Sequence, residues 1–317
     1  MTRFSLLILK HLFGTFEYVA PSLGGRVAFW LFCRTPDPRR LTEKERRILA
    51  QSREFMQQAR RHSLTTSHGE IVAYEFTNWG ARRDGPAVLV LHGWRSRSEH
   101  MRVIVEALLQ RGFRVVSVDL PGHGASGGRN LNLPKAVAAV SSAAQWLGPF
   151  DAMVGHSFGG AVALNAIAGS VGGIAPVRVR RLVTIASPNA LPELFSQFGA
   201  FFGLGQRTQK ALEGCVEDIA GTPLQAFVAA DQLRQIQIPT LVIHAPEDKE
   251  VPASDASAMG GAGEHVTVVW APGLGHRRIL ADGAIAARAA AFVATRRSRW
   301  LKPSATVALE DCLPVSD

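Results

Sequence analysis

DAMVGHSFGGAVAL, residues 151–164, is the stretch that decides the fold. It carries the pattern Gly-x-Ser-x-Gly over Gly155–Gly159, preceded by a short apolar run and followed by an alanine-rich run of helical character. A serine in that context lies on a tight turn between a strand and a helix. Glycines beside it tolerate backbone angles and close contacts that a Cβ would forbid. The sequence therefore predicts that Ser157 presents its hydroxyl as a nucleophile.

A second match to the same pattern, Gly124–Gly128, has a different context. It follows Leu120-Pro121, and Arg129-Asn130 stand where a helix should begin. This stretch is typical of a loop, so Ser126 is not expected to be a nucleophile.

The composition predicts a globular chain with a full hydrophobic core. Its 317 residues, 47% of them hydrophobic, suffice for one large α/β domain or two small ones. Cys33, Cys215 and Cys312 are widely scattered, which excludes a disulfide framework and a zinc site with Cys-x-x-Cys spacing. We expect no metal or other cofactor, small buried cysteines, and a cytoplasmic location.

The net charge of +9 is concentrated at the start of the chain. Residues 1–65 hold twelve Lys and Arg against five Asp and Glu, so the rest of the chain is close to neutral. Basic residues interleaved with aromatic ones on one face do not occur after residue 65, and we therefore expect no nucleic-acid partner.

Residues 1–65 are predicted to form a basic, partly amphipathic helical extension. Its two apolar runs, 4–16 and 18–32, are interrupted by charged residues, proline and glycine, and are too short to span a bilayer. Thr42 and Glu45 form a capping box at the start of a further amphipathic helix. Such a segment is compatible with peripheral contact to the inner face of a membrane, or with packing of its apolar stripe on the main domain.

From residue 70 onward, short apolar runs alternate with helical stretches. This alternation predicts a mostly parallel sheet with right-handed crossovers. The expected strands are 71–76, 87–91, 115–118, 152–154, 182–186, 240–244 and 266–270. The expected helices between and after them are 99–110, 133–147, 157–168 and 284–296.

The interval between residues 186 and 240 is longer than one crossover helix needs. We expect residues 187–238 to form a helical lid inserted after the sixth strand of a domain that covers 66–297. Residues 298–317 lack periodicity and are predicted to be a tail.

A serine nucleophile needs a histidine base and an acid that orients it. The partners should follow Ser157 in the order acid, then histidine, each in a loop after a strand. Of the later histidines, His276 follows the last strand in a glycine-rich loop, whereas His244 ends a strand and His265 opens one. Asp248 is the favoured acid. Glu247 and Asp255 are the alternatives.

Acyl transfer also needs hydrogen-bond donors fixed around the developing oxyanion. The backbone N–H groups of Phe158 and Trp94 are the expected donors, and Gly93 lets the backbone approach the substrate. Gly93, His156, Phe195 and Phe198 are the expected substrate contacts. The phenylalanines would favour an apolar acyl group, although packing of the lid explains them equally well.

Five stretches in the same order resemble the α/β-hydrolase fold superfamily over about residues 66–297. They are His92-Gly93-Trp94, Asp119–Ser126, Gly155–Gly159, Asp248-x-x-Val251-Pro252 and Gly273-Leu-Gly275-His276. The resemblance to these esterase-like and lipase-like serine hydrolases implies an eight-stranded, mostly parallel sheet and the triad Ser157, Asp248 and His276. It also implies that His123 and Ser126 belong to a structural turn.

The expected reaction is hydrolysis of a carboxylic ester or thioester of a small apolar acyl substrate through an acyl-enzyme. Relatives that open epoxides or displace halides carry an aspartate nucleophile, which Ser157 argues against. An acyltransferase, a carbon-carbon-bond hydrolase and a perhydrolase remain alternatives that use the same triad. A binding protein without turnover would not need Asp248 or His276. The acyl length, the leaving group and the oligomeric state stay open.

Overall fold

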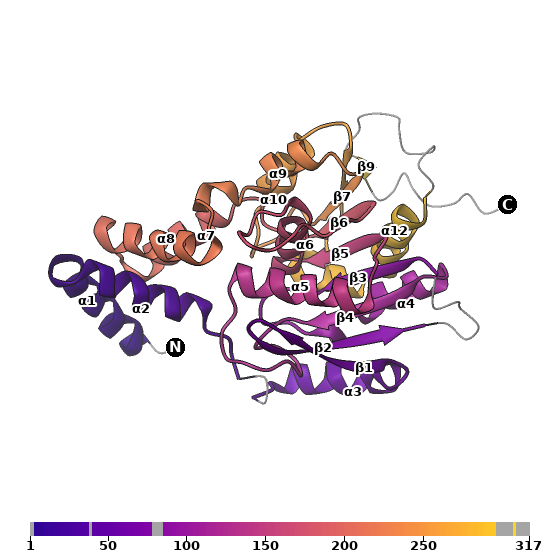
Figure 1. The fold of residues 1–317 in the computed structure, drawn as a ribbon, viewed down its shortest axis with the longest axis horizontal. Coiled ribbons are helices and arrows are strands. Elements are labelled where there is room, and N and C mark those ends of the chain that lie inside the picture. Colours follow the sequence, from indigo (N-terminus) through magenta and orange to yellow (C-terminus); the bar gives the residue numbers. More distant parts are fainter. Residues whose placement is uncertain (1–2, 38–39, 78–84, 296–306, 309–317) are drawn as a thin grey trace.

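A computed structural model describes residues 3–37, 40–77, 85–295 and 307–308. The expected tail therefore lies almost wholly outside the described residues, as does Cys312. One sheet has the strand order β1-β2-β4-β3-β5-β6-β7-β8-β9 (Figure 1). The strands are β1 (Arg60–Thr66), β2 (Gly69–Phe76), β3 (Ala87–Leu91), β4 (Arg114–Asp119), β5 (Ala152–His156), β6 (Arg181–Ile185), β7 (Thr240–His244), β8 (Val266–Trp270) and β9 (Val307–Ala308).

The pairing from β4 and β3 through β8 is parallel, which confirms the predicted sheet type. β2 pairs antiparallel with β4, and β1 pairs antiparallel with β2. β1 to β8 make up the expected eight strands, and the two-residue β9 is added beside β8. The sheet begins at Arg60, ahead of the expected domain boundary at residue 66. The sequence pattern of β1 is weak because only Leu64 and Thr66 of its side chains are buried.

Helices cover both faces of the sheet. They are α4 (Arg102–Gln110), α5 (Leu133–Leu147), α6 (Phe158–Ala168), α10 (Ala253–Gly260), α11 (Gly275–Arg278) and α12 (Gly283–Ala294), with the 3₁₀ turns η1 (Ser98–Met101) and η3 (Ile279–Ala281). Alternate residues of β3 divide between two hydrophobic clusters. Leu89 and Leu91 belong to one with α5 and α6, and Val88 and Val90 to the other with α4 and α12. Because both faces are covered, these strands are apolar throughout.

The segment 187–238 forms a helical insertion between β6 and β7. It contains α7 (Leu191–Phe202), α8 (Gln206–Ala220), the turn η2 (Leu224–Ala226) and α9 (Ala229–Ile236). α9 packs on α6, whereas α7 and α8 extend away from the sheet (Figure 1).

The first two helices of the chain, α1 (Arg3–Val19) and α2 (Pro21–Cys33), pack against this insertion. Phe13 is fully buried, 6.1 Å from the ring of Phe202. The carboxylate of Glu17 accepts the backbone N–H groups of Arg207 and Thr208, both at 2.9 Å, at the first turn of α8. An anion at a helix N-terminus is stabilising, and these two hydrogen bonds lower the pKa of Glu17. Together α1, α2, α7 and α8 form a lobe beside the sheet (Figure 1).

The third helix, α3 (Glu43–Gln57), lies apart from α1 and α2 and next to β1 (Figure 1). Its capping box is confirmed, since Glu45 N–H donates to Thr42 Oγ1 and Thr42 N–H donates to the Glu45 carboxylate. Phe55 is buried and stacks on Phe76 of β2 at 4.7 Å. The apolar stripe of α3 therefore packs on the main domain.

Candidate active site

Ser157 stands between the last residue of β5 and the first residue of α6. Its backbone has φ 52° and ψ −125°, a conformation that costs a non-glycine residue about 1–3 kcal/mol. The turn is closed by contacts that only glycine allows. A Cβ on Gly159 would lie 2.4 Å from the carbonyl oxygen of Leu91, and a Cβ on Gly93 would lie 2.9 Å from the Ser157 Cβ. The predicted strand-to-helix turn is present, and it places Ser157 at the N-terminus of α6.

His276 lies on α11, directly after β8, and contacts Asp248 in the turn after β7. Its Nδ1–H donates to Asp248 Oδ2 at 2.7 Å. Asp248 Oδ1 accepts the backbone N–H groups of Glu250 at 2.8 Å and Val251 at 3.0 Å. Burial alone would raise the pKa of Asp248, but these hydrogen bonds outweigh it and hold the pKa below its usual value. Asp248 is thus an ionised, fixed acceptor for the imidazole.

The two alternative acids make other contacts. Glu247 accepts the backbone N–H of Gly275 at 2.9 Å and so supports the loop that carries His276. Asp255 accepts the backbone N–H of Asn189 at 2.9 Å. Among the acids considered from the sequence, only Asp248 is hydrogen-bonded to the His276 ring in the part of the chain that the structure describes.

Ser157 and His276 line one cavity of about 580 Å³, together with Trp94 and Phe158. Across the described residues, the backbone N–H groups of Trp94 and Phe158 donate no hydrogen bond to the protein. Both are therefore free to bind an oxyanion. The cavity continues between α2 and the insertion, where Phe195 and Phe198 contact Phe32 at ring-centre distances of 4.2 and 5.2 Å.

His156 lies differently from the other expected substrate contacts. Its Nε2–H donates to the backbone carbonyl of His276 at 2.9 Å, and burial lowers its pKa to about 3. A neutral His156 thus holds the loop that carries the His276 imidazole. His156 lines a second cavity that shares His276 with the first, and neither cavity is lined by Gly93.

The Asp119–Ser126 turn is held by hydrogen bonds within the turn and to the neighbouring Val72 and Ser98. Ser126 Oγ donates to the carbonyl of Asp119 at 2.6 Å and accepts the N–H of Val72 at 2.8 Å. Asp119 accepts backbone N–H groups from Ser98 and Ala125, both at 2.8 Å. Ser126 is buried and occupied by these contacts, as expected of a structural serine.

Two features of the cavity had no counterpart in the sequence analysis. Glu250 lies 3.8 Å from His276 Nε2 and binds Arg277 through its two carboxylate oxygens. The hydrogen bond from Arg277 lowers the pKa of Glu250, which is therefore ionised at the cavity wall. The second feature is α2, which supplies Phe29, Phe32 and Cys33 to the wall. No motif links α2 to the site, because its role depends on packing against α8.

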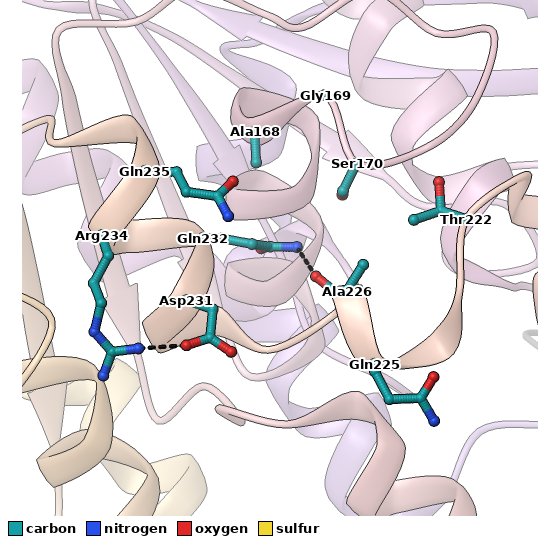
Figure 2. A pocket seen from close by; sticks show the side chains of 10 residues that line it. All are labelled: Ala168, Gly169, Ser170, Thr222, Gln225, Ala226, Asp231, Gln232, Arg234 and Gln235. Carbon is teal, nitrogen blue, oxygen red and sulfur yellow. Dashed lines mark hydrogen bonds and ion pairs between the residues drawn. The ribbon is translucent and has the colours of Figure 1, made fainter.

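A further cavity of about 640 Å³ lies at the opposite end of α6 (Figure 2). Ser157 precedes the first residue of this 11-residue helix, whereas Ala168 and Ser170 at its other end line this cavity. At 1.5 Å per residue the helix separates the two by about 16 Å. Asp231 is paired with Arg234, and Gln232 donates to the carbonyl of Ala226 (Figure 2). This cavity holds no nucleophile with a neighbouring base.

Among the described residues, no group of His, Cys, Asp and Glu side chains has the arrangement of a metal site. The same part of the chain contains no helix with the combined length and hydropathy required to cross a bilayer.

Comparison with known proteins agrees with this geometry. Residues 88–294 match the model of the alpha/beta hydrolase family, and the chain belongs to that family. It is 27% identical over 259 residues to a non-heme haloperoxidase of Rhodococcus erythropolis, a match that spans 67% of this chain and 92% of the relative. It is 29% identical to a bifunctional esterase/perhydrolase of Acinetobacter calcoaceticus, over 60% of this chain and 83% of the relative.

A solved structure described as a membrane phospholipase A and bacterial virulence factor shares the fold with a TM-score of 0.57 at 19% identity. The match covers 92% of this chain and 98% of the chain in that structure. Residues 60–317 make up only about four fifths of the chain. The match therefore includes part of α1 to α3. The protein is a hydrolase of the alpha/beta hydrolase family.

Proposed function

We propose that the protein hydrolyses carboxylic esters of apolar acids through an acyl-enzyme on Ser157. Asp248 would fix the His276 ring with Nδ1 protonated, which leaves Nε2 as the base that takes the Ser157 proton. The N–H groups of Trp94 and Phe158 would stabilise the tetrahedral oxyanion. The same imidazole would protonate the leaving alcohol and then activate the water that clears the acyl group.

The observation that carries this proposal is the continuity between the nucleophile and the apolar cavity. The 580 Å³ cavity joins Ser157 to phenylalanines of α2 and α7, with Leu131, Leu194 and Val216 among its other walls. Such a lining favours an aliphatic or aromatic acyl group over a charged or sugar-like one. Two relatives are named as esterases, a bifunctional esterase/perhydrolase and a pimeloyl-[acyl-carrier protein] methyl ester esterase, which supports ester hydrolysis as the reaction.

A panel of p-nitrophenyl esters and acyl thioesters of rising acyl length tests the proposal. We expect kcat/KM to rise from acetyl to medium-length chains and a burst of p-nitrophenol stoichiometric with enzyme wherever deacylation is slow. Ser157→Ala should lose at least 10³-fold in kcat. A wild-type enzyme that hydrolyses none of these substrates, or a Ser157→Ala variant that retains its activity, would overturn it.

Perhydrolysis is a second candidate, favoured by the relatives that bear that name or the name haloperoxidase. Hydrogen peroxide would replace water as the nucleophile on the acyl-enzyme, giving a peracid and free Ser157. Peracid formation from an acetate ester and hydrogen peroxide, measured with and without Ser157→Ala, decides between the two reactions.

We further propose that α1 contacts a membrane surface or lipid aggregate. Phe4, Leu7 and Ile8 lie on one face of α1 and are 72%, 54% and 51% exposed. Trp30 of α2 and Phe201 of α7 are also more than half exposed, and Phe201 lines the active-site cavity. Exposed apolar side chains near an apolar cavity, with Phe201 belonging to both, suit a substrate drawn from lipid.

Sedimentation with phosphatidylcholine and phosphatidylglycerol vesicles tests this contact. A Phe4→Ser/Leu7→Ser/Ile8→Ser variant should lose most of the bound fraction. Trp146→Ser is the matched control, because Trp146 is 67% exposed but lies on α5. Equal binding by the wild type and the triple variant would contradict the proposal.

A further inference from the structure

A second cavity of about 450 Å³ adjoins the apolar one, and His276 lines both. Its walls come from four segments: Thr42 with α3, the stretch 94–103 from the loop after β3 into α4, His156 of β5, and α11 with η3. The two cavities share Trp94, Arg95 and His276. Ser157 lines only the apolar cavity, and the shared residues connect the second cavity to the site of the nucleophile.

The second cavity differs from the first in its charge. Five basic side chains line it against two acidic ones, Glu45 and Glu99. The basic residues are Lys44, Arg95, Arg102, Arg277 and Arg278. Glu45 is tied up in the capping box and Glu99 pairs with Arg97 at 3.1 Å, so both acids are already engaged.

Two of the basic residues also have acidic partners. Arg277 binds Glu250, and Arg102 lies 3.6 Å from Glu106. In the described part of the chain, Lys44, Arg95 and Arg278 have no carboxylate within ion-pair distance. Three uncompensated cations beside a partly enclosed cavity create a positive potential that favours an anion.

The backbone holds Arg95 at the junction of the two cavities. Its φ of 54° is unusual for a residue other than glycine. The conformation is supported by a hydrogen bond from Arg95 N–H to His123 Nε2 at 3.0 Å. Burial lowers the pKa of His123 to about 4, and its Nδ1–H donates to the carbonyl of Pro121, so Nε2 stays available as an acceptor. Strained residues of this kind concentrate at functional sites.

We propose that the second cavity binds the leaving-group half of the ester, and that this half carries a phosphate group. The inference rests on the proposed ester hydrolysis. As the Ser157 Oγ–carbonyl bond forms and the ester C–O bond breaks, the proton that His276 took from Ser157 passes to the departing alkoxide. The alcohol must then leave past His276, where Arg95 and Arg278 meet its phosphate as charge-assisted hydrogen-bond donors.

The phosphate has two sources that share this chemistry, the headgroup of a phospholipid and a small phosphorylated alcohol. Phosphatidic acid in detergent micelles presents the first, and 1-butyryl-glycerol 3-phosphate presents the second. Hydrolysis of either in preference to the corresponding uncharged glyceride supports the subsite, and the better substrate identifies the source.

The decisive experiment compares 1-butyryl-glycerol 3-phosphate with 1-butyryl-glycerol, which differ in the phosphate alone. We expect the wild type to prefer the phosphorylated ester at least 10-fold in kcat/KM. Arg95→Gln and Arg278→Gln should each lower this ratio at least 3-fold, and high salt should lower it in the wild type. Arg180→Gln is the control, because Arg180 is exposed and pairs with Asp151 at the other end of the sheet strands.

Binding of glycerol 3-phosphate to Ser157→Ala, measured by calorimetry, separates this inference from the proposed reaction. We expect binding that weakens at least 10-fold when Arg95→Gln is added. A wild type that hydrolyses both butyrate esters equally would overturn the phosphate subsite and leave ester hydrolysis standing. An absence of glycerol 3-phosphate binding at 10 mM, about five times the dissociation constant of a weak site with Kd about 2 mM, would overturn the phosphate subsite. This outcome holds even if the enzyme cleaves no ester.

Discussion

Asp248→Asn should abolish most of the activity while leaving the fold intact. Asp248 Oδ1 accepts two backbone N–H groups, from Glu250 and Val251, and Oδ2 accepts Nδ1–H of His276. In the variant the amide oxygen must stay on the two backbone donors, so the amide NH₂ faces Nδ1. The imidazole then carries its proton on Nε2, where it cannot accept the proton of Ser157.

The expected loss in kcat is about 10⁴-fold, the size known for a triad locked in the wrong tautomer. This corresponds to about 5 kcal/mol of transition-state stabilisation. The assay is steady-state hydrolysis of a p-nitrophenyl ester, with thermal unfolding as the check on folding. Asp255→Asn is the matched control, because Asp255 also accepts one backbone N–H but does not contact His276. It should keep its kcat within about 3-fold. A loss below 10-fold in Asp248→Asn would refute the role given to Asp248.

Three further outcomes follow from the packing around the site. Gly93→Ala should be folded but nearly inactive, because its Cβ would lie 2.9 Å from the Ser157 Cβ. Turnover of a p-nitrophenyl ester measures the activity and circular dichroism measures the folding. Full activity would contradict the prediction. Phe32→Ala should lower the free energy of unfolding by about 2 kcal/mol and shift the preferred acyl chain to greater length, because it removes a ring that stacks on Phe195 at 4.2 Å. Denaturant unfolding measures the first effect and the ester panel measures the second. An unchanged length preference would show that α2 does not line the acyl site. Burial raises the pKa of Cys33 to about 12, so its thiolate is scarce at pH 8. Iodoacetamide should therefore leave Cys33 unmodified until the protein is unfolded. Rapid labelling of Cys33 in the native protein, found by peptide mapping, would contradict this prediction.

The parts of the fold that local patterns determine were predictable from the sequence. α5 and β3 begin and end at the predicted residues, because their apolar runs are bounded by turn-forming residues. The strand-to-helix turn at Ser157 and the pairing of Asp248 with His276 were also predictable, because these residues lie close to strand ends. In each case the information lies within about ten residues of the element concerned.

The parts that depend on distant packing were not predictable. Glu17 supports the first turn of α8 across a sequence separation of 190 residues, so neither segment indicates the other. Only that docking places α2 at the wall of the apolar cavity. β1 was missed because two arginines and a histidine obscure its alternation. The second cavity combines side chains from four segments and has no motif of its own.

Labelling with a fluorophosphonate probe, followed by peptide mapping, tests the central claim most directly. We predict a single adduct on Ser157 that is absent from Ser157→Ala and slow to form in Asp248→Asn. An adduct on Ser126, or none on the folded wild-type protein, would contradict it.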